Sequence, residues 1–310
     1  MRFDERPVSA HARLGVPRGV YRGAEDVGVL LARPAEVGRL GQTTGVAKTW
    51  VQVLAVGLTA AGLAGLAGLL VAQNVPAANP IDTHPAPALF DAALIAPLGA
   101  QLAAEKQIAD RLFKTWAAQH PGRDDKTFTG FAVAHLPPPP DAATQAGELT
   151  ELHALADQRT KPGKQAATWL EVYGKTNIWT KYVTDANRSD SNPGELSELK
   201  DTTRLAKAIV VVAQTHFARP GPKVADPSLK PGSNRPEKLS YPSGHASYVF
   251  AELTVLSAQQ PSRREEFLRT ANEIAYSRLY AAGHYRSDLV TGALLGDLIG
   301  DYELSLHPVR

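Results

Sequence analysis

Two short clusters of polar residues in the C-terminal half could carry out chemistry together. The first is Tyr-Pro-Ser-Gly-His at 241–245, and the second contains Arg278, His284 and Asp288. A histidine four residues before an aspartate can contact the carboxylate, which fixes the tautomer of its imidazole. An arginine binds anions, and so does the N-terminus of a helix. This combination favours phosphoryl transfer with a histidine nucleophile.

The first cluster must lie at the start of a helix. Pro242-Ser243-Gly244 is a turn sequence, and apolar residues follow it at helical spacing, at Tyr248, Val249, Leu253 and Leu256. The free N–H groups and the positive dipole end of that helix favour an anion beside Ser243 and Gly244.

Two further helices are predicted to carry the second cluster. Ser262-Arg263-Arg264-Glu265 predicts a capping box that opens the first of them. The last helix is expected to start near Ser287. Its Gly292, Gly296 and Gly300 share one face, which predicts close packing against a neighbour. Asp297 and Asp301 in the same helix are expected to be exposed or to act as capping charges.

The remaining sequence also favours helices, because strand-like alternation is scarce. Helices are expected at about 89–119, 142–158, 164–185 and 195–218, with 164–185 deeply buried. The segment 136–140 (Leu-Pro-Pro-Pro-Pro) is extended chain, and 130–135 is a short apolar piece leading into it. The loop 222–239 is long enough to suggest function. The predicted class is all-α, a compact helical bundle preceded by a single hydrophobic segment.

Composition excludes several functions. The formal net charge is +2, from 33 Lys and Arg against 31 Asp and Glu, so there is no basic stripe for nucleic acid. The absence of cysteine excludes disulfides and thiolate metal sites. The histidines outside the two clusters show no metal-ligand spacing. They are expected to be solvated, and His216 to be a helix-end residue.

The N-terminal part is predicted to direct export. Residues 1–47 form a basic, poorly structured segment, and 48–78 a signal peptide or membrane anchor. Val51 to Ala72 is uncharged for 22 residues, long enough to span a bilayer, which takes about 20 residues. The sequence leaves open whether this segment is cleaved. Either way we expect the rest of the chain in the periplasm or cell envelope, either free or held by one membrane span.

The two clusters, with their internal spacing and order, resemble the type-2 phosphatidic acid phosphatase and vanadium haloperoxidase superfamily. The similarity is closest to bacterial class A non-specific acid phosphatases, which also carry the proline segment seen at 136–140. The resemblance covers roughly 136–304. It implies that 142–310 is an acid-phosphatase-like helical domain. From its own residues, 79–141 is expected to be a helical N-terminal part with proline-rich linkers.

The resemblance implies a role for each cluster residue. His284 would be the nucleophile that becomes phosphohistidine, and Asp288 would hold its imidazole. His245 would be the general acid. The phosphoryl oxygens would be bound by a set of donors: Arg278, Ser243, Gly244 and, flanking the loop, Arg219. The implied partner is a small phosphomonoester, with no metal and no cofactor. A homo-oligomer stays open.

One motif of the family is missing. In place of its Lys-x6-Arg-Pro, the chain has Gln214 at the lysine and Gly221 at the arginine. Several nearby cations could substitute for them: Lys207, Arg219, Lys223, Lys230 and Arg235.

Because this motif is missing, two alternatives to a metal-independent acid phosphatase stay open. One is a non-catalytic cell-envelope protein that retains the scaffold with a degraded anion site. The other is a vanadium-dependent haloperoxidase.

Overall fold

The computed structural model describes residues 78–184, 194–232 and 237–308. The predicted segment 1–47, and 48–78 except its last residue, lie outside the described residues. Among those that are described, no helix is both long and apolar enough to cross a membrane. Residues from Pro76 to Arg310 form one compact unit, and the following concerns that unit alone.

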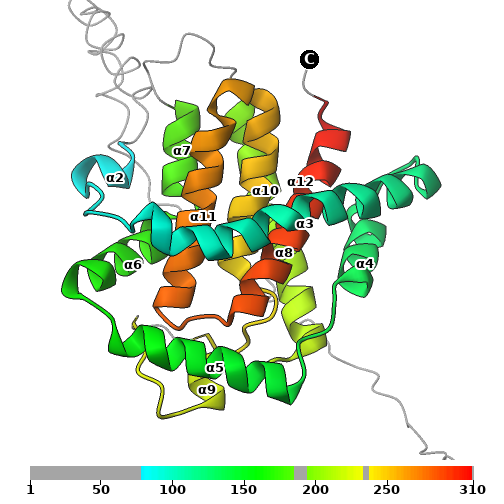
Figure 1. The fold of residues 1–310 in the computed structure, drawn as a ribbon. Helices are drawn as coiled ribbons and strands as arrows, with labels where there is room; N and C mark the ends of the chain where they lie inside the picture. The colour runs from blue at the N-terminus through cyan, green and yellow to red at the C-terminus, as the bar shows by residue number, and fades with distance from the viewer. Residues whose placement is uncertain (1–77, 185–193, 233–236, 309–310) are drawn as a thin grey trace, which may run out of the picture. The chain divides into compact units, whose positions relative to one another are not determined.

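Regular structure in the described residues is helical, apart from an isolated antiparallel bridge between Pro220 and Leu239. This confirms the predicted all-α class (Figure 1). The elements are α2 (Pro80–Thr83), α3 (Ala92–Gln119), α4 (Asp125–His135), α5 (Ala142–Asp157), α6 (Lys161–Tyr173), α7 (Asn177–Thr184), α8 (Glu195–Phe217), α9 (Pro222–Ala225), α10 (Gly244–Gln259), the 3₁₀ turn η1 (Pro261–Arg263), α11 (Arg264–Tyr280) and α12 (Arg286–Leu306).

Three local predictions were wrong. The helix expected at 164–185 is divided at Gly174 into α6 and α7, and glycine has low helix propensity. Helix α4 occupies the region expected to hold only a short apolar piece, because Asp124 caps it by accepting from the Thr127 N–H at 2.8 Å. The capping box is absent, since Pro261 starts a 3₁₀ turn and α11 begins after Arg263 without a side-chain cap.

Helices α10 and α12 pack closely along the glycine face predicted from the sequence. A Cβ added at Gly292 would lie 2.8 Å from the Ser243 carbonyl oxygen, and one at Gly296 would lie 2.5 Å from that of Ser247. The helices can approach this closely because their backbones meet without side chains between them. The same contact joins the two polar clusters, since the Ser243 N–H donates to the Asp288 carbonyl at 2.9 Å.

We expect Gly296→Ala to destabilise the protein by about 1–3 kcal/mol, the usual cost of overpacking. Its methyl group would meet backbone atoms of α10, which cannot move as a flexible side chain could. Gly147→Ala in α5 is the matched control, because nothing lies within 4 Å of its added Cβ. It should leave stability unchanged or raise it by up to about 1 kcal/mol. Urea denaturation of both variants checks this, and equal effects would contradict it.

Two hydrophobic clusters stabilise the unit. One includes Trp179 of α7, Phe250 of α10 and Phe267 of α11, and the other includes Trp116 of α3 and Tyr302 of α12. Helix α3 runs across α11 and α12 (Figure 1) and contributes to both clusters. The part predicted as 79–141 therefore shares its core with helices of 142–310.

Asp297 is not the exposed or capping charge that we expected. Its side chain is buried between α10 and α12 and accepts a hydrogen bond from Thr254 at 2.7 Å. Burial raises the pKa of Asp297 to about 7. Asp301, one turn later, pairs with Lys106 at 2.8 Å, and burial raises its pKa to about 6. Lys106 of α3 is thus placed against two acids of α12.

We expect Asp297→Asn to stabilise the protein above pH 7. Between the ordinary aspartate pKa of 3.8 and about 7, the folded chain holds a proton on Asp297 that the unfolded chain releases. Wild-type stability from this group therefore falls as pH rises through that window. The difference in free energy of unfolding between variant and wild type should grow from pH 4. It should level off above pH 7 at up to about 4 kcal/mol. Chemical denaturation across pH checks this; exposed Asp157→Asn should show no such trend.

Candidate active site

His245 and His284 face one another in the interior of the protein. His245 lies in the first turn of α10, and His284 lies in the loop between α11 and α12. Their side chains are 2% and 1% exposed, and the ring centroids are 6.5 Å apart. The Nε2 atom of each ring is buried without a hydrogen-bond partner. Both Nε2 atoms are therefore available to react with a group bound between the two rings.

Backbone carbonyls orient both imidazoles. His284 Nδ1 lies 3.1 Å from the Ser240 carbonyl oxygen, and His245 hydrogen-bonds the backbone of Glu171. A carbonyl can only accept, so each neutral ring carries its proton on Nδ1. The lone pair is then on Nε2, which is the state that a nucleophile or a metal ligand requires.

Arg278 completes the site from the end of α11. It is fully buried, and none of its Nε, Nη1 and Nη2 atoms has a hydrogen-bond partner. Glu171 Oε2 lies 3.4 Å from Nη1, close enough to offset the charge. Gly283 permits this placement, because a Cβ there would lie 2.6 Å from Arg278 Nη2. Buried donors without partners are rare in folded proteins, and a bound anion could satisfy these three nitrogens.

Ser243 and Gly244 are at the N-terminus of α10, as predicted. Ser243 is the N-cap, and its hydroxyl accepts from the Ala246 N–H at 3.4 Å. Gly244 has Tyr248 and Val210 around its Cα, where a Cβ would lie 3.0 Å from the Tyr248 hydroxyl. The positive end of this 16-residue helix lies beside His245, which favours negative charge there.

Asp288 contacts His284 less directly than expected. Its Oδ2 is 3.6 Å from His284 Nδ1 and accepts from the Tyr285 N–H at 2.9 Å. Its Oδ1 accepts from Arg219 at 2.6 Å. The His284 Nδ1–H therefore donates to the Ser240 carbonyl, and the carboxylate of Asp288 adds its charge from slightly farther away.

Arg219 is placed differently from the phosphate ligand that we predicted. Its Nη1 donates to Ser287 and Asp288, and its Nη2 donates to Glu148 at 2.8 Å. The guanidinium also stacks on Tyr285, 3.9 Å from the ring centroid. With both terminal nitrogens occupied by these acceptors, Arg219 holds Asp288 and the start of α12 in place.

The positions of the missing cations have other uses. Gln214 Nε2 donates to the Pro242 carbonyl at 3.0 Å, next to the first cluster. At Gly221 an added Cβ would collide with the backbone carbonyl of Glu237, and the Gly221 N–H donates to the Lys238 carbonyl at 3.0 Å. An arginine side chain at 221 would thus have no room.

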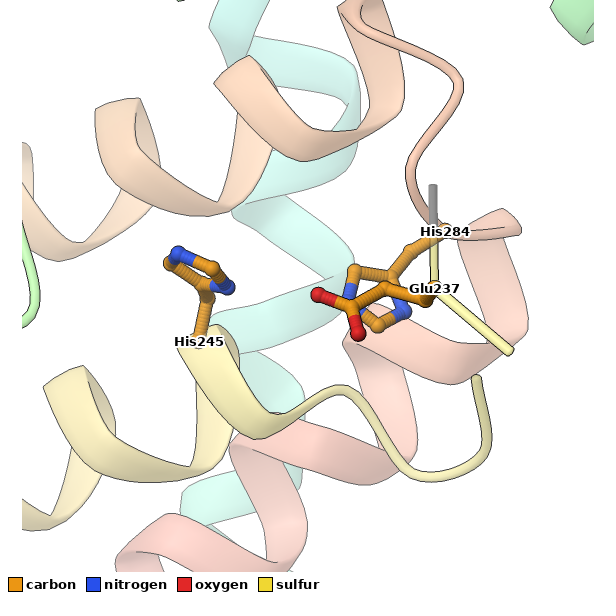
Figure 2. Close-up of side chains that lie close together, drawn as sticks. All are labelled: Glu237, His245 and His284. Carbon is orange, nitrogen blue, oxygen red and sulfur yellow. The ribbon is translucent and has the colours of Figure 1, made fainter. Parts of the chain in front are cut away.

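Glu237 is a site residue that the sequence reasoning missed. Its carboxylate points towards His245 and lies beside the imidazole of His284 (Figure 2). One ligand atom of each of these three residues lies within 4.8 Å of the other two. Its only sequence signal was its place in the loop 222–239, which we expected to be functional.

Lys175, between α6 and α7, was also missed. The positive charges of Arg278 and Lys175, after burial itself, hold the pKa of His245 well below its usual range. Burial lowers the pKa of Lys175, and the charge of Glu237 opposes that effect. Lys207, which we expected to substitute for the family lysine, is exposed but close enough to act on Lys175.

Of the other expected substitutes, Lys223 donates to the Pro227 and Leu229 carbonyls. Lys230 is exposed in the same loop, and Arg235 lies outside the described residues. Among the described residues, the cations that act on His245 are Arg278 and Lys175.

Part of the chain is similar to known proteins. Residues 202–306, which contain both polar clusters, match the PAP2 superfamily. Two similar proteins are the non-specific acid phosphatases of Salmonella typhi and Salmonella typhimurium (strain LT2), 26% and 27% identical over 175 residues. The matches cover 52% of this chain and 69% of each relative. The chain therefore contains a region that matches the PAP2 superfamily and is similar to two bacterial non-specific acid phosphatases, as its motifs predicted.

Proposed function

We propose that this protein is a metal-independent acid phosphatase that hydrolyses small phosphomonoesters through a phosphohistidine. The observation that carries the proposal is the pair of buried, unpartnered Nε2 atoms beside the unpartnered guanidinium of Arg278. The two Salmonella relatives named as acid phosphatases support a phosphoric monoester hydrolase.

In the first step, His284 Nε2 attacks phosphorus as the bond to the leaving oxygen breaks. His245, protonated on Nε2, gives its proton to that oxygen, and the alcohol departs. In the second step, neutral His245 takes a proton from water as the water oxygen attacks the phosphohistidine. Phosphate is released and His284 regains its lone pair.

The charges of the site fit this sequence. A phosphoryl group in transfer carries charge on its equatorial oxygens, so donors placed around them supply most of the catalysis. Arg278 and the start of α10 provide such donors, and Lys175 takes over part of the role of the missing cations. An incoming phosphate anion also offsets the cations that lower the pKa of His245. Substrate binding therefore favours the protonated general acid.

A direct experiment tests the proposal. Full-length protein, freed of metals with a chelator, is given p-nitrophenyl phosphate from pH 4 to 8. The reaction is quenched in base to look for protein-bound phosphate. Chelator-resistant turnover, with a phosphoprotein that is stable in base and labile in acid, is expected. No turnover would favour the alternative of a non-catalytic scaffold, and turnover that needs added metal would contradict the mechanism.

We expect Lys175→Gln to have two effects on kcat/KM. The value should fall, by up to about 10²-fold, because a donor to the phosphoryl oxygens is lost. The pH above which kcat/KM declines should move towards neutral, because the variant lacks a cation that lowers the pKa of His245. Protonated His245 is then present at higher pH. Exposed Lys164→Gln is the matched control. A fall in kcat/KM with an unmoved pH profile would contradict this role.

A further inference from the structure

We propose that Glu237, His245 and His284 form a binding site for a divalent transition-metal ion of the zinc type. Bound metal would occupy the space needed by the phosphoryl group, so it would inhibit the protein rather than assist it. The site rests on the geometry of the three side chains, and it stands whether or not the proposed hydrolysis is correct.

The three side chains are prepared as ligands. Both Nε2 atoms are buried and have no hydrogen-bond partner. On the Nδ1 side, each ring is held by a backbone carbonyl: Ser240 for His284 and Glu171 for His245. In metal sites such carbonyl contacts fix the tautomer that presents a lone pair to the ion. Glu237 supplies the carboxylate, which points towards the space between the two rings (Figure 2).

The set of ligands selects the kind of ion. Two imidazoles and one carboxylate suit zinc, and a fourth position for water is common in such sites. Magnesium and calcium prefer oxygen ligands, so two imidazoles disfavour them. Zinc bonds of about 2.0–2.2 Å place ligand atoms roughly 3.3 Å apart in a tetrahedron. The three ligand atoms lie within 4.8 Å of one another, and half-buried Glu237, at the end of a loop, can move to bring them to bonding distance.

Local charge makes a cation acceptable here. The chain has Gln214 and Gly221 at the positions of the two cations expected from the family, and the carboxylate of Glu237 lies within 4.8 Å of a ring nitrogen of each histidine. Arg278, the nearest remaining obstacle to a cation, has Glu171 at 3.4 Å. Lys175 feels the opposing charge of Glu237. The space between the histidines is therefore far less positive than a site with the whole phosphate-binding motif.

Zinc and a phosphate group would compete, because both need the lone pair of His284 Nε2. Zinc should raise the KM for a phosphomonoester, and inorganic phosphate should weaken zinc binding. A chelator should restore activity in a preparation that contains zinc.

Titration calorimetry with zinc chloride on metal-free, full-length protein at pH 7 tests the proposal. We expect one ion per chain. Glu237→Gln and His245→Ala should each weaken binding by at least about 10-fold, because even the loss of a residue that only orients a ligand costs about that much. The matched control is His153→Gln, because His153 also pairs with a carboxylate, Asp226, at 2.8 Å, but lies half-exposed outside the site. It should bind zinc like wild type.

No zinc uptake by wild type would overturn the proposal, as would equal affinity in Glu237→Gln or a loss in His153→Gln alone. Circular dichroism of each variant verifies that it is folded, and half-buried Glu237 should tolerate glutamine. Hydrolysis of p-nitrophenyl phosphate without zinc binding would refute the metal site and leave the proposed function. Zinc binding without hydrolysis would refute the phosphatase and leave the metal site.

Discussion

His284→Ala should reduce kcat for p-nitrophenyl phosphate by roughly 10⁴- to 10⁶-fold, the scale seen when a covalent nucleophile is removed. The other buried imidazole with an unpartnered Nε2 is that of His245, whose ring centroid lies 6.5 Å from that of His284 and which we propose as the proton donor. Base-stable phosphoprotein should disappear with the activity. Steady-state turnover and the quenched reaction measure the two effects on one preparation.

The choice of leaving group separates the two histidines. p-Nitrophenolate is a weak base and can leave with little protonation. A simple alkoxide is a strong base and must be protonated as it leaves. His245→Ala should therefore lose much more activity on an alkyl phosphate than on p-nitrophenyl phosphate. His284→Ala should lose activity equally on both. His153→Gln should retain turnover. Equal losses for His245→Ala on both substrates would contradict its role as the acid.

Much of the fold could be predicted from the sequence, because local patterns determine it. The apolar spacing and turn residues gave the class and the approximate bounds of α3, α5, α8, α10 and α12. The glycine repeat of α12 gave its packing face. The errors arose where a cap or a single residue decides the outcome: Asp124 starts an unexpected helix, and Gly174 ends one early. The buried surroundings of Asp297 include Lys106 and Thr254, which are far away in the sequence.

The site was predictable only where its residues lie within the two motifs. His245, His284 and Arg278 do converge. Glu237 and Lys175 come from segments without a motif, so only the folded chain shows them beside the histidines. Arg219 illustrates the opposite error. It is near the site in sequence and in space, but Glu148 and Asp288 compete for its guanidinium, and no local pattern reveals such partners.

Arg278→Met should lower kcat/KM by about 10²- to 10³-fold, because the main donor to the phosphoryl oxygens is removed. Arg278→Lys should recover only part of the loss, since an ammonium group lacks the planar fork of donors. Phosphate should also stop raising the melting temperature in the methionine variant, because a ligand stabilises the folded state only when it binds. Turnover and thermal unfolding with and without phosphate measure these effects.

The stability of Arg278→Met separates a binding role from a structural one. Removing one member of a well-bonded buried ion pair usually costs about 3–5 kcal/mol. Arg278, however, leaves all its guanidinium nitrogens without hydrogen bonds, and its carboxylate neighbour is 3.4 Å away. Methionine removes buried donors that no partner satisfies, so we expect a loss of less than about 1.5 kcal/mol. A large loss of stability with phosphate protection intact would assign Arg278 to the core. If the variant is stable but phosphate no longer raises its melting temperature, the role of the buried Arg278 is to bind the anion.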